Sequence, residues 1–129
     1  LKRAPYMGPM KQFPEHTAGE KTSFPPARMA LRDLYRSARH LSSTDPYAPA
    51  RLARIADQAE YFLQAWPASA WPQALHSGQA LPARQTLLIW VQSAKREINQ
   101  LGTTPAVTWS YPAWHRIFTL LLAALVHFA

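Results

Sequence analysis

The stretch ARMALRDLYRSARHL, residues 27–41, decides the fold class that this sequence predicts. Its apolar residues recur at steps of three and four, the spacing of one helix face: Ala27, Leu31, Leu34, Ala38 and Leu41. A second set recurs every four residues and forms a basic stripe on another face: Arg28, Arg32, Arg36 and His40. We therefore expect an amphipathic helix that buries one face and presents arginines on another.

The same apolar spacing occurs twice more along the chain. Asp45 is a good N-cap, Pro46 suits a first helical position, and the apolar pattern then continues to about Trp66. Pro82 opens a third helical segment, which ends where Gly102 can form a left-handed C-terminal cap. No alternating strand pattern bounded by turn pairs occurs in the sequence. The sequence thus predicts an all-α protein.

The two ends of the chain differ from this helical centre. Residues 1–26 contain five prolines, and we expect them to form an extended arm. Residues 103–129 read as a loop and a last helix that starts at Ser110 and Pro112. Residues 117–129 of that helix carry little polarity, but a bilayer crossing needs about 20 residues. We favour a helix packed against membrane subunits or one membrane leaflet; a short span and a fourth core helix stay open.

Composition narrows the function classes. With 129 residues the chain can form one domain with a modest core. Lys and Arg outnumber Asp and Glu by 14 to 7, and the resulting charge of +7 favours an acidic partner: a protein, a nucleic acid or a membrane surface. Cysteine is absent, which excludes disulfides, thiolate metal sites and cysteine nucleophiles.

Residues suited to catalysis or metal binding are scattered. No two of the five histidines stand three or four residues apart, so the sequence has no helical metal-ligand spacing. The acidic residues are too few and too dispersed for a paired-carboxylate site, and the four glycines form no phosphate loop. We expect neither a metal site nor an enzyme.

The triplet Leu34-Tyr35-Arg36 in its basic helix resembles the motif of the LYR-motif family of small, basic mitochondrial proteins. In that family the triplet lies near the start of the first of three antiparallel helices. The family's second helix carries basic residues and a phenylalanine near its end, and Arg51, Arg54 and Phe62 resemble that element. The sequence departs from the family pattern at Glu60-Tyr61, where an arginine usually precedes the phenylalanine.

The resemblance implies a fold. It covers residues 27–102, which we expect to form an antiparallel three-helix LYR-type bundle between the extended arm of residues 1–26 and the hydrophobic C-terminal helix within residues 103–129. The arm and the C-terminal helix are not general features of the family.

The resemblance also implies a function. Family members bind the mitochondrial acyl carrier protein, so we expect a non-catalytic accessory subunit of an inner-membrane respiratory complex on the matrix side. Complex I is preferred, because two of its accessory subunits belong to the family. No cofactor would be bound directly, since the partner presents the acyl-4′-phosphopantetheine. Other expected contacts are further subunits of the complex and, through residues 112–129, the membrane surface or membrane subunits; DNA is not expected.

Two groups of site residues follow from the resemblance. The acidic carrier would be held by the motif and its neighbouring arginines, which can bind carboxylates bidentately: Leu34, Tyr35, Arg36, Arg32, Arg39, Arg51 and Arg54. The acyl chain, stabilised by about 0.8 kcal/mol per buried methylene, would lie in a slot lined by Ala38, Ile55, Ala59, Phe62, Val91 and Ala94.

Several alternatives stay open at this point. Five tryptophans and a charge of +7 would also suit a mitochondrial ribosomal or other RNA-associated subunit. An LYR-type assembly factor, or a subunit of another inner-membrane complex, would share the same motif. Without the three-helix context, Leu34-Tyr35-Arg36 would be an ordinary amphipathic turn with a half-buried tyrosine and a solvated arginine.

Overall fold

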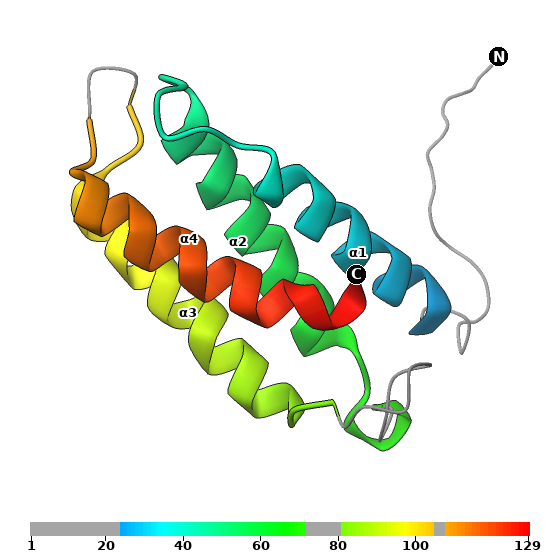
Figure 1. The fold of residues 1–129 in the computed structure, drawn as a ribbon. Coiled ribbons are helices and arrows are strands. Elements are labelled where there is room, and N and C mark those ends of the chain that lie inside the picture. The colour runs from blue at the N-terminus through cyan, green and yellow to red at the C-terminus, as the bar shows by residue number, and fades with distance from the viewer. Residues whose placement is uncertain (1–23, 72–80, 105–107) are drawn as a thin grey trace, which may run out of the picture.

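The computed structural model describes residues 24–71, 81–104 and 108–129, with side chains from residue 27 onward. This part of the chain contains no strand, and its helices are α1 (Phe24–Arg39), α2 (Ala48–Ala65), α3 (Arg84–Leu101) and α4 (Tyr111–Leu125), with the short 3₁₀ turns η3 (Ala68–Ala70) and η4 (Val126–Phe128). Successive long helices run in opposite directions (Figure 1). The all-α prediction is confirmed for the described residues.

The four long helices form one ring of neighbours. α1 packs against α2 and α4, and α3 packs against the same two helices. Figure 1 shows α4 in front of the bundle, between α1 and α3. Of the possibilities considered for the last helix, α4 is therefore the fourth core helix of this domain. None of the described helices has both the length and the apolar character that a membrane crossing requires.

The core is shared by all four helices because each contributes an apolar face. The predicted face of α1 is buried at Ala27, Leu31, Leu34 and Ala38, while Leu41 is half-buried after the helix end. α4 buries its own face against the same core with Ala113, Trp114, Ile117, Leu121, Ala124 and Leu125. Burial of this face removes a large apolar area from water, which is the main force that holds α4 in the bundle.

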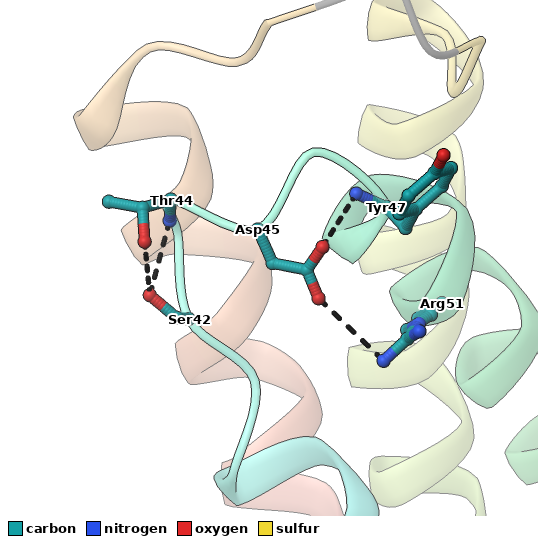
Figure 2. A network of polar contacts seen from close by, with 5 residues as sticks. All are labelled: Ser42, Thr44, Asp45, Tyr47 and Arg51. Atoms are coloured by element: carbon teal, nitrogen blue, oxygen red, sulfur yellow. Dashed lines mark hydrogen bonds and ion pairs between the residues drawn. The ribbon is translucent and has the colours of Figure 1, made fainter.

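Three helix starts differ from the predicted ones. α1 begins at Phe24, so residues 24–26, expected in the arm, are helical; the rest of the expected arm lies outside the described residues. α2 begins at Ala48 rather than after Asp45, and α3 begins at Arg84 rather than at Pro82. The carboxylate of Asp45 accepts a hydrogen bond from the Tyr47 backbone N–H at 2.9 Å (Figure 2). This contact forms a turn ahead of the helix, so Asp45 is not its N-cap.

Two other helix-end predictions concern α3 and α4. The last helix starts after Ser110, as predicted, and Ser110 is its N-cap, with the Oγ accepting from the Ala113 backbone N–H at 3.3 Å. Gly102 ends α3 with φ 84° and ψ 162°. The positive φ is confirmed, but ψ is extended and not left-handed helical. This backbone region is accessible almost only to glycine.

Tryptophan side chains close both ends of the bundle. At one end the Trp109 indole N–H donates to the Gly102 carbonyl at 2.9 Å, which ties the α3–α4 connection to the end of α3. At the other end the rings of Trp66 and Trp71 meet edge to face with centroids 4.9 Å apart, and both lie near Phe128. Each of these indole rings buries apolar area while its N–H donates a hydrogen bond. The Trp66 N–H donates to the Ala70 carbonyl, and the Trp71 N–H donates to the Pro82 carbonyl.

Candidate functional site

The motif triplet on α1 points in three directions, because successive helical residues are rotated by about 100°. Leu34 is buried in the core, Tyr35 is half-buried and lines a hollow against α4, and Arg36 is exposed. Arg39, one turn after Tyr35, lies over its ring, with its guanidinium carbon 5.7 Å from the ring centroid. The motif is thus anchored in the core at Leu34 and carries its charge on the surface.

Three arginines of α1, namely Arg32, Arg36 and Arg39, form no ion pair with a described residue. Arg36 and Arg39 are exposed, and neither forms an ion pair with any described residue. The Nε atom of Arg32 is shielded from solvent, and no described residue hydrogen-bonds to it. Asp33 is the single acid in the sequence of this helix. The outer surface of α1 therefore presents net positive charge.

Arg51 and Arg54 lie on α2, where both are exposed and line a hollow of about 320 Å³ together with Tyr47 and Ala50. The Arg51 guanidinium is 3.6 Å from the Asp45 carboxylate, which also receives the Tyr47 N–H (Figure 2). An ion pair this exposed contributes little to stability. Both arginines can therefore interact with a partner.

The structure does not bring the seven predicted carrier contacts into one cluster. Glu60 marks the side of α2 that faces α3, because it accepts from Gln92 and Lys95 of that helix. Arg51 precedes Glu60 by nine residues, or two and a half helical turns, which places it on the opposite side of α2. Arg51 therefore faces away from α3. Arg39, by contrast, lies on the side of α1 that faces α4, beside Tyr35. Arg36 is exposed on the outer surface of α1.

The six predicted slot residues belong to the core. Ala38, Ile55, Ala59, Val91 and Ala94 are buried, and Phe62 packs half-buried against them. The described hollows are lined by other residues. The acyl-chain slot stays a prediction.

Another hollow, which we call the α1–α4 groove, has a volume of about 530 Å³. One side is Tyr35 of α1, and the other is a row of side chains on α4 that includes Tyr111, His115, Phe118, Leu122 and, at the helix end, Val126. Our sequence reasoning missed this groove, because it depends on α4 packing beside α1. The available signal was the spacing of the row, which repeats at steps of three and four.

Ionisable groups cluster elsewhere, between α2 and α3. The Lys95 ammonium donates to Glu60 and lies 3.0 Å from the Asp57 carboxylate, and Gln92 also donates to Glu60 at 3.0 Å. The hydrogen bond from Lys95 lowers the pKa of Glu60, and the same bond raises the pKa of Lys95. Complementary charges that satisfy each other in this way join two helices. Within the described ranges no three His, Asp or Glu residues are grouped so as to hold a metal ion.

Comparison with known proteins gives no matching family model, no curated protein of significant similarity and no solved structure of significant similarity. The resemblance to the LYR-motif family therefore rests on the residues of the chain itself.

Proposed function

We propose that this protein is a non-catalytic docking subunit that binds an acidic acyl carrier protein through the arginine-bearing surface of α1. The observation that carries the proposal is the position of Arg36. It is exposed and makes no ion pair with a described residue, on a helix that Leu34 anchors in the core.

The electrostatics of α1 suit such a partner. Arginine binds carboxylates bidentately, and an unneutralised basic surface accelerates the encounter with an acidic protein. Arg51 and Arg54 on α2 supply a second basic patch on the side of that helix that faces away from α3. A carrier that contacts Arg36 and this patch would lie along the outer surfaces of α1 and α2.

The finer proposal follows the resemblance of Leu34-Tyr35-Arg36 to the LYR motif. In it, the partner is the mitochondrial acyl carrier protein with an acyl-4′-phosphopantetheine arm. The docking subunit belongs to an inner-membrane respiratory complex, with complex I preferred. An LYR-type assembly factor, or a subunit of another inner-membrane complex, would use the same surface.

An RNA-associated role is the less favoured proposal, because three of the five tryptophans that suggested it are core residues and cannot stack on bases. Trp66, Trp109 and Trp114 are all buried in the bundle core. The charge of +7 alone does not distinguish RNA from an acidic protein.

The experiment is co-expression of the full chain with an acyl carrier protein, followed by affinity purification and size-exclusion chromatography. We expect the Arg36→Glu variant to lose the carrier, because the substitution places a carboxylate against an acidic surface. Arg96→Glu is the matched control, since Arg96 is an exposed arginine of α3 on another face. Carrier retention by the Arg36→Glu variant at the wild-type level, or salt-resistant binding of RNA instead of carrier, would refute the proposal.

A further inference from the structure

We propose that the α1–α4 groove is a second docking site, which takes an amphipathic helix of a partner protein with acidic residues along one edge. This site adjoins the outer surface around Arg36, since Arg32 and Arg39 are four and three residues from Arg36 on the same helix. It uses the side of α1 that faces α4 and the row on α4 itself.

The α4 side of the groove has the spacing of a helix-packing seam. Tyr111, His115, Phe118, Leu122 and Val126 recur at steps of four and three, so they form one continuous stripe along the helix. The ends of the stripe are open to solvent, with Tyr111 67% and Val126 43% exposed, while Phe118 and Leu122 are half-buried between them. At 1.5 Å per residue the stripe is about 22 Å long, the length of a helix of about four turns.

The edge of α1 beside the groove supplies charge. Arg32 and Arg39 are seven residues apart and therefore lie on one stripe of α1, and Arg39 covers the ring of Tyr35, which lines the groove. Neither arginine forms an ion pair with a described residue, and the Nε of Arg32 is shielded from solvent with no hydrogen-bond partner among these residues. The lining of the groove thus lies beside a cationic edge of α1, which consists of Arg39 over the Tyr35 ring and Arg32 on the same stripe.

These two sides specify the occupant. A helix that lies between two antiparallel helices places one stripe against each of them, as a further member of a bundle. Its apolar stripe would face Phe118 and Leu122, and Asp or Glu on the adjacent edge would face Arg32 and Arg39. A second copy of this chain fits less well because it carries the same charge of +7. A flat membrane surface does not match a concave groove.

The test uses three synthetic peptides of about four helical turns with an identical Leu stripe and one variable edge of Glu, Gln or Lys. Binding to the full chain is measured by fluorescence anisotropy. We expect the Glu peptide to bind about tenfold or more tightly than the Lys peptide, and its binding to weaken with salt. Equal affinities for the Glu and Lys peptides, or no binding of the Glu peptide, would overturn the proposal.

Three variants locate the binding. Leu122→Lys should remove Glu-peptide binding, whereas Ile89→Lys, at an exposed apolar residue of α3, should leave it unchanged. The double variant Arg32→Glu/Arg39→Glu should reverse the preference from the Glu peptide to the Lys peptide, because both cations that face the variable edge then become acids. This reversal cannot arise from unfolding, and circular dichroism checks the helix content of each variant.

The same reagents separate this proposal from carrier docking and from other occupants. Leu122→Lys should remove peptide binding and leave carrier binding intact, so the two sites can fail independently. Sedimentation of the wild-type chain as a dimer that Leu122→Lys dissociates would assign the groove to a second copy. Leu122-dependent binding to anionic phosphatidylserine vesicles, without peptide binding, would assign it to a membrane. Either result would overturn the helix proposal.

Discussion

The guanidinium carbon of Arg39 lies 5.7 Å from the centroid of the Tyr35 ring, one helical turn away on α1. This distance is within the range of a cation–π interaction. The contact keeps a cation beside the ring that lines the α1–α4 groove, and it places both residues on the side of α1 that faces α4. Arg36, next to Tyr35 in the sequence, is exposed on the outer surface of the same helix.

The first prediction measures the contact between Tyr35 and Arg39. A double-mutant cycle of Tyr35→Leu and Arg39→Met should give a coupling energy of about 0.5–1 kcal/mol in the free energy of unfolding, the range of an exposed cation–π pair. Urea unfolding of the four proteins checks it. Additive effects would show that Arg39 and Tyr35 do not interact in solution.

The second prediction tests whether α4 belongs to the core. Leu121→Ala should lower the free energy of unfolding by about 2–5 kcal/mol, because Leu121 is fully buried and its removal leaves a cavity. Leu120→Ala is the matched control, since Leu120 is the neighbouring leucine and only half-buried. Urea unfolding should show the larger loss for Leu121→Ala. Equal small losses would mean that α4 does not pack as described.

The third prediction concerns the backbone at the end of α3. Gly102→Ala should cost about 1–3 kcal/mol, because a Cβ is disfavoured at φ 84° and ψ 162°. Gly102→Asn should cost a similar amount. Asparagine adopts the left-handed helical conformation readily, but it does not readily adopt an extended conformation with positive φ. Thermal unfolding measures both variants. An Asn variant as stable as wild type would instead indicate a left-handed helical cap.

The fourth prediction uses the pH dependence of the Lys95–Glu60 pair. The pKa of Glu60 is lowered from 4.5 by the hydrogen bond from Lys95, so its stabilising effect is complete above that value and is lost as the pH falls through the folded-state pKa. The pKa of Lys95 is raised from 10.5 by the same hydrogen bond. The stabilisation that the charged Lys95 contributes is therefore complete below pH 10.5 and is lost as the pH rises through the folded-state pKa of Lys95.

Glu60→Gln should therefore cost about 1 kcal/mol at pH 7 and much less in strong acid, where the wild-type carboxylate is protonated as well. Urea unfolding at both pH values measures the difference. Asp57→Asn removes a more exposed partner of Lys95 and should have a smaller effect. A loss from Glu60→Gln that is independent of pH would show that the ion pair is not its source.

Local patterns account for the parts of the structure that we predicted correctly. The apolar face of α1 is buried because residues spaced by three and four lie on one side of any α-helix. Ser110 caps α4 because its hydroxyl lies within reach of the backbone N–H three residues on. The start of α2 was predicted wrongly, since the Asp45 carboxylate binds the Tyr47 N–H and forms a turn instead of a helix cap.

The grouping of the candidate site residues depends on helix packing. Arg39 and Arg51 both lie on amphipathic helices with exposed basic residues, and their sequence spacing does not reveal which neighbour each one faces. Arg39 lies toward α4 because Tyr35 contacts the groove there, and Arg51 faces away from α3 because Glu60 faces toward it. Contacts between distant segments decide both positions.

The sequence by itself determined that this protein is helical, where its apolar faces lie and that its surface is basic, because each property depends on residue type and local spacing. Only the tertiary structure decided that α4 completes the bundle between α1 and α3. Burial of an apolar helix against any apolar surface is favourable, so the sequence of the helix does not determine which surface it packs against. That placement joins the Tyr35 side of α1 to the α4 row, and it creates a groove that neither segment contains alone.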